Sequence, residues 1–282
     1  DCNQQEKGII MSDRVVVNVE DGIADVRLNR PEKLNALDTG MFRAIVNAGE
    51  ELKERSDVRV AVLSGEGRSF CAGLDFASFQ AMGQSNNEAG VDADDMADTA
   101  ANSLEGRITH LGQQAAWVWQ ELEVPVIGAI TGHALGGGFQ IAMGPDIRIV
   151  HPDTKMSVLE IRWGLVPDMG ASVLLPPLVG LDVAKEMYFT GKMISGSEAV
   201  ELGVATRTAD DPHAEAMELA REISEKNPDA IRRMKNILNG LQERNTAERF
   251  AAEREHIGAL IGSPNQTEAV SAFFEKRRPE FS

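Results

Sequence analysis

The stretch Thr131-Gly132-His133-Ala134-Leu135-Gly136-Gly137-Gly138 decides the fold, because it joins an apolar run to a short helix. The run before it, from Pro125 to Ile130, is apolar throughout and predicts a buried strand. Glycine has no Cβ, so the backbone can adopt a positive φ and a ligand atom can approach closely. The first amides of the following helix, expected over residues 138–144, would point at that ligand and favour negative charge.

Spacing alone leaves two of four interpretations of this glycine-rich turn open. A dinucleotide phosphate loop fits poorly, because the G-x-G-x-x-G spacing and the acidic residue expected about 20 positions further on are absent. A G-x-x-x-x-G-K-[ST] loop is absent too. An oxyanion hole made of backbone N–H groups fits, and so does a tight turn with no function.

A second glycine-containing segment favours the oxyanion hole. Arg68-Ser69-Phe70-Cys71-Ala72-Gly73-Leu74-Asp75 follows the apolar run from Val58 to Ser64, which also predicts a buried strand. Two strand ends, each followed by a turn of small residues, can place two N–H donors around one oxygen. An enolate oxygen needs such donors, and each contributes roughly 3–4 kcal/mol in the transition state.

The rest of the chain predicts an α/β core followed by helices. Residues 15–19 and 23–28 alternate as a hairpin around Asp21-Gly22, and residues 146–150 form a further strand. Residues 80–98 are polar and acidic and predict a surface loop. Helices are expected over 39–55, 104–122, 171–179, 181–190, 196–202, 212–226, 229–242, 246–261 and 266–277.

Composition narrows the possible partners. The formal net charge of -16 over 282 residues argues against nucleic acid or an anionic membrane as the main partner. No apolar run reaches about 18 residues, so we expect no transmembrane helix. Two cysteines make no disulfide framework, which favours a reducing cytoplasm. Residues 1–10 lack the features of a signal peptide and are expected to be a disordered tail or leader without a role in the fold.

Four motifs together resemble the enoyl-CoA hydratase/isomerase, or crotonase, family. They occur in the family's order and span nearly the whole chain. They are Asn29–Leu37 (NRPEKLNAL), Ser69–Asp75 (SFCAGLD), Gly132–Gln140 (GHALGGGFQ) and Ala272–Arg277 (AFFEKR).

The resemblance implies a crotonase-like spiral of ββα units with a C-terminal helical region. The expected organisation is an α/β core over residues 11–200 and a helical trimerisation or cap region over 201–282. It also implies a cytoplasmic homotrimer or hexamer of fatty acid metabolism that acts on an acyl-CoA thioester, with no cofactor beyond the CoA of the substrate.

The resemblance also implies where the ligand lies. The thioester oxygen would sit between the N–H groups of Leu74 and Gly137. Lys276 and Arg277 would supply positive charge for the phosphates, although a solvated helix end is an equal alternative. The implied CoA-binding residues are Lys33, Ala36, Ala72, Asp75 and Phe76, with Phe273 and Lys276 reaching the CoA of a neighbouring subunit.

The acid–base residues depart from the hydratase pattern. Hydratases of the family hold a water between two glutamates, and the corresponding positions here are Gln140 and Glu160. A neutral amide cannot accept a proton at neutral pH, so half of the water-activating pair is missing. Asp168 resembles an aspartate of the dienoyl-CoA isomerase subclass, which also carries an acid at the position of Gln140.

Glu160 and Asp168 on either side of a flat acyl chain could move a proton between two carbons while the oxyanion hole holds the dienolate. The sequence therefore favours a double-bond isomerase of enoyl- or dienoyl-CoA, with Glu160, Asp168 and Gln140 in the site. The alternatives are an enoyl-CoA hydratase and a non-catalytic acyl-CoA binding protein. Glu160 could instead pair with Arg162 or Arg148, and Asp168 could be a turn residue.

Other side chains predict less. The five histidines show no metal-binding spacing, so no metal site is expected. Cys71 has no evident histidine partner and is expected to be a small buried residue. Trp163 is a candidate to line the acyl pocket.

Overall fold

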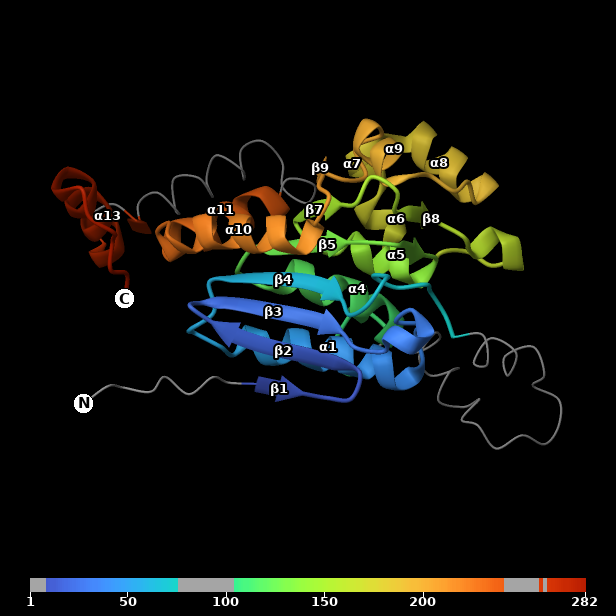
Figure 1. The fold of residues 1–282 in the computed structure, drawn as a ribbon, viewed down its shortest axis with the longest axis horizontal. Helices are drawn as coiled ribbons and strands as arrows, with labels where there is room; N and C mark the ends of the chain where they lie inside the picture. Colours follow the sequence, from blue (N-terminus) through green and yellow to red (C-terminus); the bar gives the residue numbers. More distant parts are fainter. Residues whose placement is uncertain (1–8, 76–103, 241–258, 261–262) are drawn as a thin grey trace.

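The computed structural model describes residues 9–75, 104–240, 259–260 and 263–282 of the chain. Its main sheet has seven strands in the order β1-β2-β3-β4-β5-β7-β9 (Figure 1). The first three strands are antiparallel, and every pairing from β3 to β9 is parallel. The strands are β1 (Ile9–Met11), β2 (Val15–Glu20), β3 (Ile23–Leu28), β4 (Val60–Gly65), β5 (Val126–Ile130), β7 (Ile147–Val150) and β9 (Arg207–Thr208).

The predicted N-terminal hairpin is confirmed, since β2 and β3 pair along their whole length. Asp21 and Gly22 between them both have the positive φ that a tight hairpin turn requires. The expectation that residues 1–10 play no part in the fold is wrong for the last two of them. Ile9 and Ile10 pair with β2 in the antiparallel strand β1. An edge strand offers unpaired N–H and C=O groups, and an apolar segment nearby can use them. Residues 1–8 lie outside the described part.

Helices cover both faces of the sheet, as expected for an α/β core. On one face α1 (Thr39–Lys53) packs against α4 (Leu111–Glu121), and on the other α10 (Pro212–Ser224) packs on β4, β5 and β7 (Figure 1). Successive side chains of β4 point to opposite faces of the sheet. Ala61 and Leu63 therefore pack in the larger core, and Val60 and Val62 pack in the smaller core that includes residues of α10.

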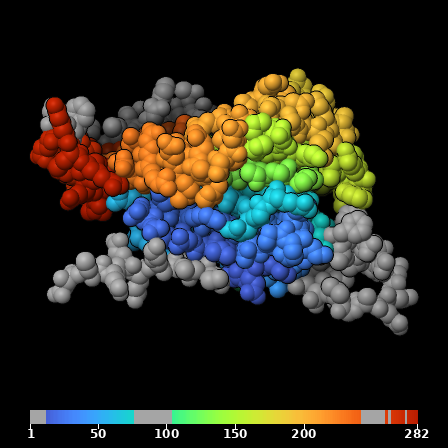
Figure 2. Space-filling model, in the orientation of Figure 1, coloured from blue at the N-terminus to red at the C-terminus, as the bar shows by residue number. Residues whose placement is uncertain are grey.

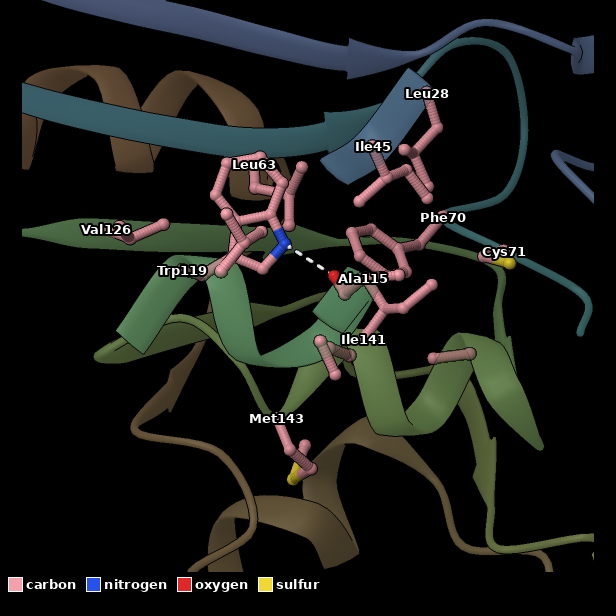
Figure 3. Close-up of a cluster of buried hydrophobic side chains, with 14 of the residues drawn as sticks. Leu28, Ile45, Leu63, Phe70, Cys71, Ala115, Trp119, Val126, Ile141 and Met143 are labelled. Carbon is pink, nitrogen blue, oxygen red and sulfur yellow. Dashed lines mark hydrogen bonds between the residues drawn. The ribbon is translucent and has the colours of Figure 1, made fainter. Parts of the chain in front are cut away.

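The larger core anchors the segments that build the site. Figure 3 shows Trp119 and Phe70 among Leu63 and Ile141, all four fully buried. The Trp119 indole N–H donates to the carbonyl of Ala115 at 3.0 Å, so its one polar group is satisfied. Phe70 holds the chain just before the Ala72-Gly73-Leu74 turn, and Ile141 holds the helix after the triple glycine.

The helical C-terminal part follows the predicted pattern with local differences. The helix expected over 171–179 is two short helices that meet at Pro176, because proline cannot donate the helical hydrogen bond. The helix expected over 104–122 begins only at Leu111, where the His110 side chain caps it. The helices are α6 (Ala171–Leu174), α7 (Pro176–Val179), α8 (Leu181–Thr190), α9 (Gly196–Glu201), α11 (Pro228–Asn239) and α13 (Pro264–Glu275).

The chain after residue 200 first completes the core. β9 joins the sheet beside β7, and α10 packs on β4, β5 and β7. In the space-filling view, the orange residues of this part lie against the blue and cyan N-terminal part (Figure 2). The trimerisation role expected for residues 201–282 stays a prediction. The helix expected over 246–261 and the loop expected over 80–98 fall wholly or mostly outside the described residues. No helix in the described part is long and apolar enough to cross a bilayer.

A small second sheet was missed from sequence. β6 (His133–Leu135) and β8 (Lys155–Ser157) pair in parallel beside the main sheet. Three residues are too few for a hydrophobic period to be recognised, and β6 lies inside the stretch that the glycines mark as a turn. β6 leads directly into Gly136, whose N–H donates to the carbonyl of Ser157 in β8, so this small sheet fixes where the triple glycine begins.

Candidate active site

The two glycine-containing segments lie side by side and are joined by backbone hydrogen bonds. Cys71 N–H donates to His133 O at 2.8 Å, and Leu135 N–H donates to Cys71 O at 3.1 Å. Gly73 has a φ of +91°, and a Cβ there would lie 2.6 Å from Leu135 O. Only glycine permits this approach, which explains the residue type at that position.

The Asn29–Leu37 loop forms a third layer against the same turn. Leu37 N–H donates to Gly73 O, and Asp75 N–H donates to Leu37 O, both at 2.8 Å. The two bonds use the carbonyl of Gly73 and the N–H of Asp75, which flank Leu74. The N–H of Leu74 is therefore not used in the pairing with Leu37. Asn35 is fully buried and donates to the carbonyls of Glu66 and Ser69, which fixes the loop in place.

An ion pair links the Asn29–Leu37 loop to the segment that contains Gly73 and Leu74. The Arg30 guanidinium lies 2.6 Å from the Asp75 carboxylate, with 13% and 9% of the two side chains exposed. Arg30 also donates to the carbonyl of Ala36 at 3.2 Å. Asp75, named above for CoA binding, therefore directs its carboxylate to Arg30, and a CoA contact stays a prediction.

The other residues that the sequence implies in CoA binding differ in their exposure to solvent. Lys33 and Lys276 are exposed, Ala72 is half-buried and Ala36 is buried. Phe76 lies outside the described residues, and so does the side chain of Phe273. Lys276 follows α13 and has a φ of +53°. Their role in binding CoA stays a prediction.

The triple glycine starts α5 (Gly137–Ala142), one residue earlier than expected. The Gly137 N–H is one of the first amides of the helix and has no partner within it. Gly136, at φ +53°, donates its N–H to Ser157 O at 3.0 Å, which ties the turn to β8. Gly137 and Leu74 thus lie on adjacent hydrogen-bonded segments, each with an amide outside the regular pairing.

α5 places Gln140 in the interior, fully buried, where its amide is hydrogen-bonded at both ends. Its Nε2 donates to Glu160 Oε1 at 2.7 Å. Its Oε1 accepts from the N–H groups of Met169 and Ala171 at 2.8 and 3.3 Å. Gln140 therefore connects α5, the 3₁₀ turn Glu160–Trp163 and the segment before α6, and it orients the glutamate.

Glu160 forms no ion pair with the described residues. Arg148 donates instead to the carbonyls of Val204 and Pro145, and neither Arg148 nor Arg162 forms an ion pair with Glu160 within the described residues. The alternative that pairs Glu160 with either arginine is therefore wrong. A Cβ on Gly136 would lie 3.5 Å from Glu160 Oε1, so the carboxylate faces the glycine-rich turn.

The second oxygen of Glu160 has a different environment. Oε2 is buried and has no hydrogen-bond partner among the described residues. Burial raises the pKa of Glu160, the hydrogen bond from Gln140 opposes that shift, and the negative charge of Asp168 adds to it. Asp168 is exposed and lies close enough for this repulsion to act. Glu160 thus has one oxygen, Oε1, that Gln140 holds, and a second, Oε2, without a partner among the described residues. The raised pKa makes the carboxylate a stronger base.

Tyr188 is a polar residue near Glu160 that the sequence motifs do not indicate. It lies on α8, its hydroxyl is buried, and burial together with the Glu160 charge raises its pKa to about 12. Its only signal in the sequence is that it is the single tyrosine of the chain. Trp163 is 52% exposed in this single chain, so its place in the acyl pocket stays a prediction.

The described part of the chain supports neither a reactive thiol nor a metal site. Cys71 is fully buried and burial raises its pKa to about 12, which confirms a small buried residue. No group of three or more histidine, cysteine, aspartate or glutamate side chains could hold a metal there. The site is therefore two amides on adjacent segments and one buried carboxylate that faces them.

Comparisons with known protein families, sequences and structures all indicate the same family. A family model described as enoyl-CoA hydratase/isomerase matches residues 18–282. The chain is 32% identical over 272 residues to the short-chain-enoyl-CoA hydratase of Clostridium acetobutylicum, covering 94% of this chain and 96% of that protein. It is 28% identical over 273 residues to the crotonyl-CoA hydratase of Syntrophomonas wolfei, covering 95% and 98%. The crystal structure of an enoyl-CoA hydratase from Bacillus anthracis superposes with a TM-score of 0.84 at 25% identity, covering 95% and 98%.

Proposed function

Since this chain belongs to the enoyl-CoA hydratase/isomerase family, whose enzymes act on acyl-CoA thioesters, we propose that it moves a carbon–carbon double bond along an enoyl thioester. The thioester oxygen is held by the N–H groups of Leu74 and Gly137. Glu160 is the acid–base group that carries the proton. The observation behind this assignment is the hydrogen bond from Gln140 to Glu160, which leaves the site with one available carboxylate oxygen.

The oxyanion part follows from the backbone. Leu74 and Gly137 each have an amide outside the regular pairing, and they lie on segments that are bonded to each other. Two such donors stabilise the negative charge that develops on the thioester oxygen when C2 loses a proton. The tight network around Gly73 keeps them in place without reorganisation.

The proton transfer needs only one carboxylate when the double bond moves by one position. Glu160 Oε2 removes a proton from C2 of a 3-enoyl thioester, and the electron pair delocalises into a dienolate. The same carboxyl group returns the proton to C4, which gives the 2-enoyl product with all atoms retained. The raised pKa of Glu160 suits a group that must both accept and return a proton.

Asp168 extends the proposal to dienoyl substrates. Moving two conjugated double bonds requires protonation at a carbon further from the thioester, beyond the place where Glu160 removes the first proton. Asp168 is exposed and close enough to repel Glu160, so it is the candidate for that second group. Gln140 has no acid–base role in either reaction, because both ends of its amide are occupied.

The test offers 3-enoyl-CoA and 3,5-dienoyl-CoA to the purified protein and follows the migration of the double bonds. We expect the unmodified protein to convert both, Glu160→Gln neither, and Asp168→Asn only the 3-enoyl substrate. Activity as kcat/KM should fall as the pH drops through the raised pKa of Glu160, because the base becomes protonated. Turnover of 3-enoyl-CoA that survives in Glu160→Gln would refute the assignment.

Hydration of a 2-enoyl thioester is the second candidate, because the relatives from C. acetobutylicum and S. wolfei are named as hydratases. Gln140→Glu would restore a second carboxylate, so we expect this variant to gain hydration and lose isomerisation. Fast hydration by the unmodified protein with slow isomerisation would favour the hydratase. Tight CoA-thioester binding without turnover, unchanged in Glu160→Gln, would indicate an acyl-CoA binding protein instead.

Assembly and location complete the proposal. We expect a cytoplasmic homotrimer or hexamer that needs no cofactor beyond the substrate's CoA. Support comes from exposed apolar side chains near the site, which a subunit contact would cover. They include Ile161, Trp163, Leu165, Val166, Leu181 and Phe189. Sedimentation analysis of the purified chain measures the oligomeric state.

A further inference from the structure

The side chain of Met169 lies against the glycine that starts α5. Apart from its chain neighbours and the backbone of α5, the heavy atoms nearest to the position where Gly137 would carry a Cβ belong to Leu37 and Met169. Leu37 Cδ1 lies 2.8 Å from that position, and Met169 Sδ and Cε lie 2.9 and 3.6 Å from it. The end of the Met169 side chain therefore borders the residue whose N–H we assign to the oxyanion hole.

The stem of the same side chain reaches α4. Met169 Cγ lies 3.4 Å from the position where Gly112, in the first turn of α4, would carry a Cβ. Because Gly112 has no side chain of its own, the side chain of Met169 occupies the space beside it. Met169 thus spans the interval between the start of α4 and the start of α5, and only 5% of it is exposed.

The backbone fixes where Met169 lies. Its N–H donates to Gln140 Oε1 at 2.8 Å, in the segment between the Glu160 turn and α6. The preceding residue, Asp168, is exposed, whereas Met169 packs in the larger core. A different side chain at this position would leave the hydrogen bond to Gln140 in place, because the N–H belongs to the backbone. Substitution of Met169 therefore changes mainly the volume available between Gly137 and Gly112.

We propose that Met169 limits the length of the acyl chain that the site accepts, so that the substrates are short-chain thioesters. The inference rests on the proposed function, in which the N–H groups of Leu74 and Gly137 hold the thioester oxygen. An acyl chain that starts there and extends towards α4 meets the Met169 side chain after its first few carbons. The thioether has no proton to transfer, so Met169 decides which chains fit and leaves the proton transfer to Glu160.

Binding of saturated thioesters tests the inference without any turnover. Butanoyl-CoA, hexanoyl-CoA and octanoyl-CoA have no double bond to move or hydrate, and they differ only in chain length. With the unmodified protein, titration calorimetry should show no gain in affinity beyond butanoyl-CoA, because the added carbons find no apolar space. A chain free to enter an apolar pocket would instead bind about fourfold more tightly for each methylene, which corresponds to about 0.8 kcal/mol.

The informative variant is Met169→Ala, which removes Cγ, Sδ and Cε from the space between Gly137 and Gly112. We expect this variant to bind hexanoyl-CoA about tenfold more tightly than butanoyl-CoA, since two methylenes enter the freed space. Met169→Leu nearly conserves the volume and should keep the short-chain preference. Met169→Val removes less volume than the alanine variant, so its gain for hexanoyl-CoA should be smaller.

Met143→Ala is the matched control for the loss of a buried methionine. Met143 is 1% exposed in the same larger core (Figure 3), at the other end of α5 from Gly137. This variant should lose stability as Met169→Ala does, because each leaves a cavity in the core. It should keep the short-chain preference, since its cavity lies away from the oxyanion hole. Thermal unfolding measures the stability, and calorimetry with the three thioesters measures the preference.

The outcomes separate this inference from the proposed reaction. A gain for longer chains in Met169→Ala, absent in Met169→Leu and Met143→Ala, supports the inference. An affinity that already rises with chain length in the unmodified protein overturns it, and so does a short-chain preference that survives in Met169→Ala. Met169→Val decides in the same way if the alanine variant does not fold. Failure of the isomerase assay together with the shift in chain length would refute the proposed reaction and leave this inference in place.

Discussion

The region around Leu74 and Gly137 and the region from Glu160 to Asp168 are built by different means. Backbone hydrogen bonds at 2.8–3.1 Å tie the first region together, and a Cβ on Gly73 or Gly138 would clash with backbone oxygens. The second region is a 3₁₀ turn followed by exposed residues, and the side chain of Gln140 hydrogen-bonds to Glu160 within it. The first region depends on the path of the backbone, whereas the second depends on the identity of a few side chains.

This difference explains how one fold can serve several reactions. The stabilisation of an enolate needs only amides in fixed places, so the first region can stay unchanged while the reaction varies. The fate of the proton depends on which carboxylates face the substrate, and a single replacement such as glutamine for glutamate changes it. The acid–base region is therefore where the choice between isomerisation and hydration lies.

Removing the one available carboxylate should have the largest effect. We expect Glu160→Gln to lower the rate of double-bond migration by about 10²–10⁴-fold, the usual contribution of a positioned acid–base group. Binding of an unreactive acyl-CoA should change little. Glu186→Gln, an exposed change on α8, is the control for the loss of a charge. Steady-state kinetics measure both, and a loss of less than tenfold would place the acid–base group elsewhere.

Disturbing the backbone region should cost both activity and stability. In Gly73→Ala the new Cβ would lie 2.6 Å from Leu135 O at a φ of +91°, so the segment carrying Leu74 must shift. We expect kcat to fall about 10²-fold through the loss of an oxyanion donor, and stability to fall by about 1–3 kcal/mol.

The comparison is Gly164→Ala in the acid–base region. Gly164 also has a positive φ, +70°, but nothing lies within 4 Å of its Cβ position. We expect a cost of about 1 kcal/mol and nearly full activity. Urea unfolding and kcat measure the pair. Equal losses of activity in the two variants would show that the backbone region is no more constrained than the other.

Breaking the Arg30–Asp75 ion pair should have a smaller effect on catalysis and should act mainly on stability. Both side chains are largely buried, so we expect Arg30→Met to destabilise the fold by about 3–5 kcal/mol. Arg55→Met breaks the pair with Asp57, whose side chain is 58% exposed, and should cost about 0–1 kcal/mol. Urea unfolding compares the two, and a similar cost for both would mean that the buried pair does not hold the turn.

The smallest effect concerns the pH dependence of stability. Burial raises the pKa of Glu160 above its ordinary value of 4.5 in the folded chain, so the folded state binds its proton more tightly than the unfolded state. Glu160 therefore lowers stability as the pH rises from about 4.5 through the raised pKa, and the loss is complete above it. Glu160→Gln should melt slightly higher than the unmodified chain at neutral pH, and the difference should shrink on acidification. Thermal unfolding across this range checks the sign, and a lower melting temperature for the variant at neutral pH would contradict it.

The sequence predicts the parts of the fold whose signal is local. The hairpin around Asp21-Gly22 and the apolar strands β4 and β5 follow from alternation, turn residues and continuous apolar runs. The short pair β6 and β8 and the edge strand β1 could not be predicted, since each has three residues and depends on pairing with a distant partner. The late start of α4 depends on a histidine cap, a residue type that is rare in that role.

For the site, the motifs indicate Leu74, Gly137, Gln140 and Glu160, because each follows a glycine-rich signal or a family pattern. They do not indicate that Arg30 pairs with Asp75, or that Tyr188 lies close enough to Glu160 for the charge of the carboxylate to raise the pKa of its phenol. Both contacts join residues far apart in the chain, and no spacing in a single sequence encodes them.

By itself the sequence determined the family, the two glycine turns and the replacement of a glutamate by Gln140. Only the tertiary structure decided what that glutamine does. Its hydrogen bonds to Glu160, Met169 and Ala171 leave one carboxylate oxygen available. Glycine positions can be recognised from sequence because steric limits act locally on the backbone. The partners of a buried amide cannot, because they depend on which distant segments the packing of the core brings together.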